Sequence, residues 1–346
     1  MKKLLFLSIC WMLALPASYA QIGGRHVYDF LNLVPAARIA ALGGVNVSLM
    51  DDDVNMGYQN PALVNDSMHH RASLSYSSYL ADIGYGYAAY SRTIEGVASF
   101  HTGIHYVSYG EMQGADEFGN LTNTFSANDI AWIIGFSRQV KGFRYGSNLK
   151  VINSTLADGF SSLGVAVDVG TAYRSKNKLF SAGLVMKNMG AQLTTYTGSG
   201  GREPLPFEIQ MGISNKLKYM PLRFSLTATN LEHPNLIFDN PDDVPEVDLS
   251  GNEVEQSSNL VDNIFRHAVF SGEFLLGRAV RLRGGYNHLR RQELRSEDRA
   301  GLSGFSLGFG LRISRIAIDY GYASFGAASA FNNHQFSLRL DLNKRT

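Results

Sequence analysis

The stretch His334-Gln-Phe-Ser-Leu-Arg-Leu-Asp-Leu342 alternates large apolar and polar residues without a break. In a β-strand, Phe336, Leu338 and Leu340 would point to one face of the sheet and the residues between them to the other. Comparable stretches recur about fourteen times from Arg71 onward, with charged residues on the non-aliphatic face. A lipid-facing surface requires this placement, because a charge near the bilayer midplane is costly. The sequence therefore predicts an all-β fold, a transmembrane antiparallel β-barrel of about 14 strands.

The connections between the expected strands alternate in length. Tight links follow the even-numbered strands, as at Lys141-Gly142 and Ser314, whereas longer links follow most odd-numbered strands. Short periplasmic turns alternate with longer outer loops when both termini of a barrel are periplasmic. The longest expected loops are 109–127, 189–205, 230–263 and 291–302. The expected strands are 71–79, 83–92, 96–108, 128–140, 143–155, 161–174, 179–188, 206–217, 221–229, 264–276, 279–290, 303–313, 315–325 and 334–342.

The first twenty residues have the pattern of an export signal. A basic start is followed by an apolar run from Leu4 to Leu15 and a small-residue cleavage site, Ser18-Tyr-Ala20. Residues 1–20 are therefore predicted to be a signal peptide, since the run is too short to span a bilayer. The single cysteine, Cys10, lies in this run, so the mature chain would hold no thiol for disulfides or metal sites. The net charge of +1 gives no support for a nucleic-acid partner.

Residues 21–70 do not alternate and are expected to form a separate segment. They contain Gly43-Gly44, which permits a tight backbone path, and Asn60-Pro61, which favours a turn. A segment of this length at the end of a wide barrel can fold into the lumen and block it. The expected organisation is a signal peptide at 1–20, an N-terminal hatch or plug at 21–70 and a barrel at 71–346.

Two motifs in this segment resemble a known superfamily. Pro35-Ala-Ala-Arg-Ile-Ala-Ala-Leu-Gly-Gly44, an acidic cluster and Asn60-Pro-Ala-Leu63 are similar to the N-terminal signature of FadL-like outer-membrane proteins. The resemblance implies a fourteen-stranded barrel with an N-terminal hatch, in a superfamily that includes transporters of fatty acids and aromatic hydrocarbons. Pro206-Phe-Glu-Ile-Gln210, Phe336-Ser-Leu-Arg-Leu340 and the overall length resemble, more narrowly, the PorQ family of the Bacteroidetes type IX secretion system.

The narrower resemblance implies a non-enzymatic platform in the outer membrane. It implies that extracellular loops anchor a surface-exposed, PorZ-like secretion-system protein in an attachment complex with a sortase and a shuttle barrel. That complex joins cargo to anionic lipopolysaccharide at the cell surface. The resemblance supplies no motif of site residues. The alternative belongs to another class, a FadL-type outer-membrane transporter that admits hydrophobic small molecules through a movable hatch.

The loop 230–263 is the main candidate for a binding surface. It is acidic, and a neighbouring loop carries arginines. Such charges can pair with one another, dock a surface partner or contact lipopolysaccharide, and an acidic run can also simply keep a loop solvated. Exposed pairs contribute little energy, so pairing alone does not explain so long an insertion. The candidate partner-binding residues are Asp239, Asp242, Asp243, Glu246, Asp248, Arg290, Arg291 and Arg295.

No catalytic, cofactor-binding or metal-binding residue is assigned. The Asp51-Asp52-Asp53 triplet lacks the spacing of a Ca²⁺ loop, so structural ion pairs in the hatch are expected there. His101 and His105 share a strand face but lie about 13 Å apart along it, too far to share a metal. Lumen charges such as Arg223, Arg283 and Arg339 can line a channel or pair with the hatch and leave no open path.

Overall fold

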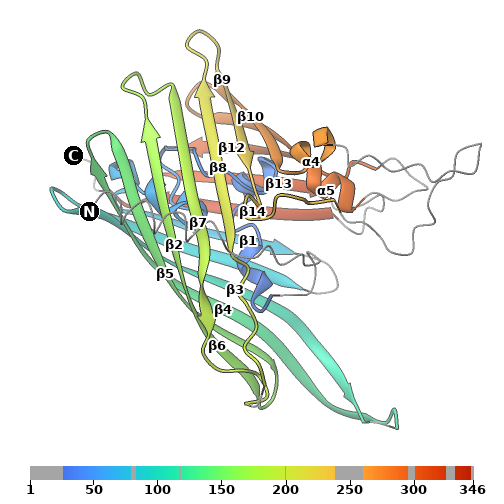
Figure 1. The fold of residues 1–346 in the computed structure, drawn as a ribbon. Coiled ribbons are helices and arrows are strands. Elements are labelled where there is room, and N and C mark those ends of the chain that lie inside the picture. Colours follow the sequence, from blue (N-terminus) through green and yellow to red (C-terminus); the bar gives the residue numbers. More distant parts are fainter. Residues whose placement is uncertain are drawn as a thin grey trace, which may run out of the picture.

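The protein is a closed antiparallel barrel of fourteen strands that follow one another in chain order (Figure 1), and this confirms the predicted fold class. The structure, a computed structural model, describes residues 26–78, 83–116, 118–198, 200–237, 260–294, 301–324 and 332–343. The barrel closes where the first strand pairs with the last, from Arg71 opposite Asp341 to Ser78 opposite His334. The strands are β1 (Arg71–Ser78), β2 (Gly84–Ile94), β3 (Ala98–Ala115), β4 (Leu121–Val140), β5 (Phe143–Ala157), β6 (Phe160–Arg174), β7 (Phe180–Gln192), β8 (Glu208–Lys216), β9 (Leu222–Ala228), β10 (Ala268–Leu276), β11 (Val280–Asn287), β12 (Phe305–Ile313), β13 (Ile316–Ser324) and β14 (Asn332–Asp341).

Side chains alternate across the wall as the sequence pattern predicts. In β14 the Phe336 side chain is 55% exposed on the outer face, whereas Gln335 on the inner face is 1% exposed. Phe309 and Ile318 also lie on the outer face, and Asp319 is buried inside. The outer surface is therefore apolar and suited to lipid, and the lumen is polar. Among the described residues, no helix is both long enough and apolar enough to cross a membrane.

The two ends of the barrel differ. At one end, the turn end, short links join the strands at 95–97, 141–142, 175–179, 217–221, 277–279 and 314–315. Lys141, Lys178 and Ser314 in these links have positive φ, as tight hairpin turns require. The described parts of the longer connections, 193–198, 200–207, 229–237, 260–267, 288–294 and 301–304, lie at the other end, the loop end.

Several strand boundaries differ from the prediction. Most of 109–127, expected to be a loop, continues the β3–β4 hairpin beyond the rest of the wall (Figure 1), with register shifts between Ser108 and Ala115. This part of the hairpin is exposed on both faces, so its sequence lacks the one-sided apolar pattern that identifies a strand. Residues 264–266 belong to a helix, α4 (Leu260–Arg266), and 288–290 begin another, α5 (His288–Glu293), so β10 and β11 are shorter than predicted.

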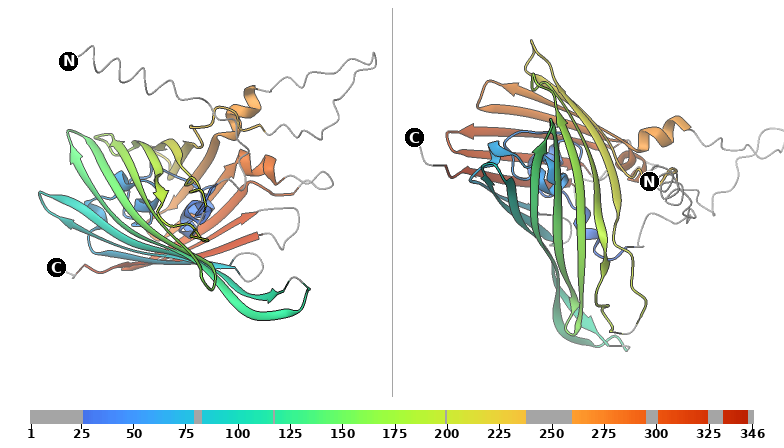
Figure 2. Two further views of the ribbon diagram at one scale, coloured as in Figure 1. Left: turned by 60° about the horizontal axis from the view of Figure 1, so that its bottom comes forward. Right: turned by 60° about the vertical axis from the view of Figure 1, so that its left-hand side comes forward.

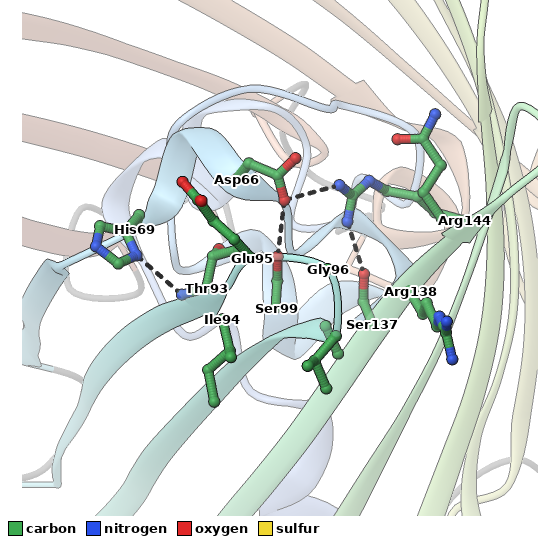
Figure 3. A pocket seen from close by; sticks show the side chains of 13 residues that line it. Asp66, His69, Thr93, Ile94, Glu95, Gly96, Ser99, Ser137, Arg138 and Arg144 are labelled. Carbon is green, nitrogen blue, oxygen red and sulfur yellow. Dashed lines mark hydrogen bonds and ion pairs between the residues drawn. The ribbon is translucent and has the colours of Figure 1, made fainter.

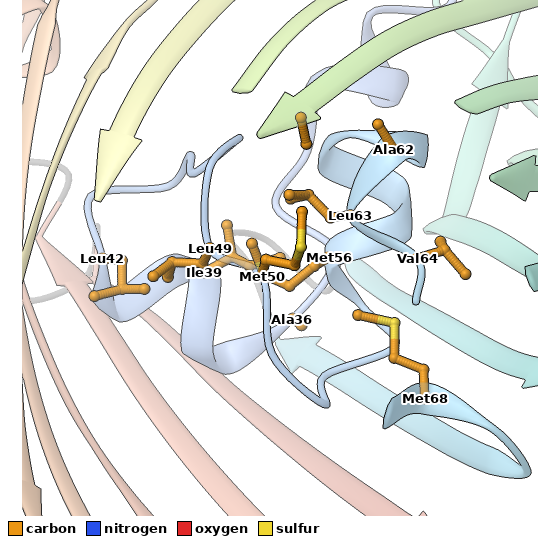
Figure 4. Close-up of a cluster of buried hydrophobic side chains, with 11 residues drawn as sticks. Ala36, Ile39, Leu42, Leu49, Met50, Met56, Ala62, Leu63, Val64 and Met68 are labelled. Carbon is orange, nitrogen blue, oxygen red and sulfur yellow. The ribbon is translucent and has the colours of Figure 1, made fainter. Parts of the chain in front are cut away.

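Residues 26–70, here called the plug, lie inside the ring of strands (Figure 2). The plug contains η1 (Asp29–Asn32), α2 (Ala37–Ala41), α3 (Met56–Gln59), η2 (Pro61–Leu63) and η3 (Asp66–Met68). Its own apolar core includes Ile39, Leu49, Met56 and Leu63, all nearly inaccessible to solvent (Figure 4). Folding of the plug therefore buries an apolar cluster inside the barrel, and further apolar clusters join the plug to inward-facing wall residues such as Ile133 and Ile152.

Glycines in the barrel wall let the plug touch it directly. A Cβ atom added to Gly321 in β13 would lie 2.2 Å from the backbone oxygen of Ala37. A Cβ added to Gly183 in β7 would lie 2.0 Å from the backbone oxygen of Val47. Such contacts are too close for any side chain, so the plug backbone packs against the wall on opposite sides of the lumen.

Candidate functional site: the plug latch and the loop-end bracket

A buried ion-pair cluster, here called the latch, holds the plug to the barrel. It consists of Arg38, Asp51 and Asp53 from the plug and Glu273 from β10. Arg38 binds Asp51 through two parallel hydrogen bonds, Nη2 to Oδ2 at 2.7 Å and Nη1 to Oδ1 at 3.0 Å. Its Nε donates to Glu273 Oε1 at 3.1 Å, and its Nη1 donates to Asp53 Oδ2 at 3.1 Å. The fork of one guanidinium therefore connects two plug carboxylates with one from the wall.

Wall residues extend the latch around the lumen. Arg223 donates to Glu273 at 2.7 Å and to Asp51 at 3.1 Å. Arg283 donates to Glu273 at 3.1 Å and to Asp319 at 2.6 Å. Arg339 donates to Asp319 at 2.8 Å and lies 3.7 Å from Asp53. The network pairs four guanidinium groups (Arg38, Arg223, Arg283 and Arg339) with four carboxylates (Asp51, Asp53, Glu273 and Asp319), so its charges balance.

The acidic triplet of the sequence lies at this contact. Asp52 pairs with Arg71 at 2.5 Å and also with Arg312, both from the wall. Burial favours the neutral form of the Asp51 carboxyl, but Arg38 and Arg223 outweigh burial and hold its pKa well below the usual range. Burial likewise opposes the charge of Arg38, but Asp51 and Glu273 raise its pKa well above the usual value. The triplet therefore makes ion pairs, and most of them cross from plug to wall.

A cavity of about 580 Å³ lies at the turn end beside the last part of the plug (Figure 3). Its polar groups bind one another: Arg144 donates to Asp66 at 3.1 Å, and Ser99 donates to the same carboxylate oxygen at 3.1 Å. His69 accepts a hydrogen bond from the backbone N–H of Thr93 at 3.1 Å. These contacts fix the plug to β2, β3 and β5.

A register shift between β6 and β7 is closed by polar contacts. Asp168, at the shift, accepts a hydrogen bond from the backbone N–H of Asn188 at 2.8 Å. The buried Lys150 ammonium lies 2.9 Å from Asp168 and donates to Asn188 at 2.7 Å. The Asn188 amide in turn donates to the backbone oxygen of Pro206 at 2.9 Å. This irregular part of the wall is therefore filled by side chains that bind each other.

At the loop end, α4, α5 and the segment 230–237 form a unit here called the bracket. Asp262 of α4 accepts hydrogen bonds from Arg266 at 2.7 Å and from His288 of α5 at 2.8 Å. Asn263 binds the 230–237 segment twice, accepting from Leu236 N–H at 2.8 Å and donating to Pro234 O at 2.7 Å. The polar side chains of α4 therefore face the protein.

Three of the four apolar residues of α4 face outward, while Phe265 packs against Phe270 and His288. Leu260, Val261 and Ile264 are 72%, 62% and 67% exposed. Positions i, i+1 and i+4 lie on one side of a helix, so these three form a single apolar patch. This arrangement is the reverse of an ordinary surface helix, whose apolar side is buried. Sequence reasoning missed this patch because it placed a strand from Ile264 onward. The available signal was the Asp262–Arg266 pair, whose four-residue spacing favours a helix.

The structure describes two of the predicted docking residues, and both make contacts within the chain. A Cβ added to Gly44 of the plug would lie 2.6 Å from Arg290 Nη2, so this guanidinium packs against the plug. Arg291 donates to the backbone oxygen of Gly301. Asp239, Asp242, Asp243, Glu246, Asp248 and Arg295 lie outside the described residues. Within the described ranges, no group of three or more His, Cys, Asp or Glu residues is arranged to hold a metal ion.

Comparison with known proteins identifies the fold. Neither family models nor curated proteins gave a match to the sequence. Among solved structures, the Pseudomonas putida toluene transporter TodX matches with a TM-score of 0.52 and 11% identity over 89% of this chain and 96% of that one. A Pseudomonas aeruginosa FadL homologue matches with a TM-score of 0.52 and 11% identity over 93% and 100% of the chains. The CymD monoaromatic hydrocarbon channel matches with a TM-score of 0.50 and 13% identity over 91% and 100%. The chain therefore has the fold of FadL-like outer-membrane barrels.

Proposed function

We propose that this protein is a non-enzymatic outer-membrane platform that anchors a surface partner at the loop end of a plugged barrel. The observation that carries the proposal is the outward apolar patch of Leu260, Val261 and Ile264 on a bracket held by hydrogen bonds. Exposed apolar groups that are held in place by polar contacts are typical of protein-binding surfaces. The latch supports the same proposal, because it ties the plug to the wall through buried charges instead of leaving a passage.

The sequence resemblance to the PorQ family suggests the system to which the platform would belong, the type IX secretion system. The partner would then be a PorZ-like protein, held near the sortase and the shuttle barrel while cargo is joined to anionic lipopolysaccharide. In the sequence, the candidate docking residues Asp239 to Asp248 lie between residue 237 and α4, and Arg295 follows α5. In this proposal their charges form the polar rim of an interface whose apolar centre is the patch of α4.

Mild-detergent purification of the tagged protein from its native outer membrane tests the proposal. The test variant carries Leu260→Ser and Ile264→Ser, and the control carries Phe118→Ser, a loop-end phenylalanine that is 82% exposed. We expect one large surface protein to copurify with the wild type and the control and to be lost from the α4 variant. Equal recovery with all three proteins would remove α4 as the dock. Recovery of the barrel alone in every case would contradict the platform.

The second candidate function is transport of a hydrophobic small molecule. The observation in its favour is that the fold is shared with proteins described as a toluene transporter and a monoaromatic hydrocarbon channel. In this case the α4 patch would be a first contact for the solute, and the plug would have to move. Uptake of radiolabelled toluene by whole cells separates the two functions, because the lipopolysaccharide layer slows an apolar solute that would cross phospholipid liposomes unaided. A transporter would make uptake faster in cells with the protein than in cells without it, whereas a latched platform would leave the two rates equal.

A further inference from the structure

The turn end of the barrel has a strong excess of positive charge on one side. Three successive links, 141–142, 175–179 and 217–221, and the strand residues next to them contain lysines and arginines but no aspartate or glutamate. The link 175–179, the plug and residues of the strands from β6 to β11 surround a cavity of about 380 Å³. Its charged lining residues are Asp51, Arg174, Lys178, Lys216, Arg223 and Arg281.

The single carboxylate that lines this cavity, Asp51, is already paired with arginines. Asp51 binds Arg38 through two hydrogen bonds and binds Arg223 at 3.1 Å. Arg223 and Arg38 both belong to the latch network, in which four guanidinium groups balance four carboxylates. The network therefore has no negative charge to spare for the other cations that line the cavity.

Arg174 and Arg281 line the cavity but do not belong to the balanced latch network. Both are half-buried, and neither forms an ion pair with any described carboxylate. Arg281 Nη1 is buried and has no hydrogen-bond partner within the described part of the chain. Lys178 and Lys216 add two exposed ammonium groups at the rim. Partly buried charges of one sign without a counter-charge destabilise a protein, because they repel each other and have lost hydration.

We propose that this cavity binds the phosphate group of an anionic ligand. Guanidinium groups bind phosphate oxygens through pairs of hydrogen bonds, and lysines add point charges around them. A phosphate monoester concentrates nearly two negative charges in one compact group, whereas one carboxylate brings a single charge. The ligand enters from the turn end, which is the periplasmic side if the short turns lie there. A soluble phosphate-bearing solute and a lipid headgroup share this chemistry. The site is independent of the platform proposed for the loop end.

Calorimetric titration of inorganic pyrophosphate into the full chain, held in phosphatidylcholine nanodiscs, tests the proposal. The test variant carries Arg174→Gln and Arg281→Gln. The control carries Arg278→Gln, which removes the same type of charge from an exposed turn residue that does not line the cavity. We expect saturable binding to the wild type, a loss of affinity of at least about tenfold in the double variant, and a change below about twofold in the control. Absence of saturable binding, or equal weakening in both variants, would overturn the proposal.

Thermal stability without ligand distinguishes a binding role from a structural one. If the two arginines serve an absent anion, the double variant should melt at a higher temperature than the wild type and should not respond to pyrophosphate. If they are structural, it should melt at a lower temperature, and the proposal fails.

Nanodiscs that contain phosphatidylglycerol show whether the phosphate group belongs to a lipid headgroup or to a soluble solute. Weaker pyrophosphate binding in these discs than in phosphatidylcholine discs would assign the site to a lipid headgroup. Unchanged binding would assign it to a soluble phosphate-bearing solute.

Discussion

Replacing Arg38 by glutamine should release the plug. The side chain is 1% exposed and contacts Asp51, Asp53 and Glu273, so the substitution leaves a buried network with one uncompensated negative charge. Removing one partner from a buried ion-pair network typically costs about 3–5 kcal/mol. At about 1.4 kcal/mol per factor of ten, the unseated fraction of the plug should rise roughly a hundredfold or more.

Single-channel recording in planar bilayers measures this release directly. We expect the purified wild type to stay closed at pH 7.5 and the Arg38→Gln variant to open repeatedly. Arg38→Lys keeps the charge but loses the fork, so it should open at an intermediate frequency. Arg278→Gln, in an exposed turn, should behave as the wild type. A closed Arg38→Gln channel with unchanged thermal stability would refute the latch.

The pH dependence of the openings provides a second check. In the wild type the pKa of Asp51 is depressed, so its contribution to stability is present above its unfolded pKa of about 3.9. That contribution is lost only as the pH falls through the lower, folded value, so the wild type should stay closed at pH 5. Without Arg38, the pKa of Asp51 should rise, and protonation would relieve the excess negative charge. Openings of Arg38→Gln should therefore be rarer at pH 4.5 than at pH 7.5.

Three further substitutions test the seat of the plug and the bracket. Gly321→Val should lower the stability by about 1–3 kcal/mol in chemical denaturation, since the new side chain would meet the backbone of Ala37. Burial raises the pKa of Glu232 to about 7, so the destabilising charge develops between the unfolded value and pH 7. Glu232→Gln should therefore raise the melting temperature at pH 8 and leave it nearly unchanged at pH 4. Asp262→Ala removes two hydrogen bonds of α4, including the one from His288, and should speed hydrogen exchange across 260–266.

The strands could be predicted from the sequence because lipid imposes a simple rule. In β12, β13 and β14 one face must be apolar, and this period of two identifies each strand and its orientation. Strand segments that extend beyond the lipid are not required to have one apolar face. The far part of the β3–β4 hairpin has no one-sided apolar pattern, so the sequence predicts a loop where the structure has strands.

The pairing of charges could not be predicted, because it depends on contacts distant in sequence. Arg38 and Glu273 are 235 residues apart, and only the closed barrel and the seated plug bring them together. The same holds for Arg174 and Arg281, because only the folded structure shows that no described carboxylate forms an ion pair with either of them. The apolar patch of α4 is a local feature, but its outward orientation depends on α5 and the 230–237 segment.

The distribution of secretion-system cargo between the cell surface and the medium tests the platform most directly. The measurement compares cells that carry, at the native locus, the wild-type gene, the Leu260→Ser/Ile264→Ser variant or the Phe118→Ser control. The account predicts that cargo stays on the surface with the wild type and the control. It predicts that cargo moves into the medium with the α4 variant, while the amount of barrel in the outer membrane is unchanged. Cargo that remains attached in cells with the α4 variant, or in cells that lack the protein altogether, would contradict the account.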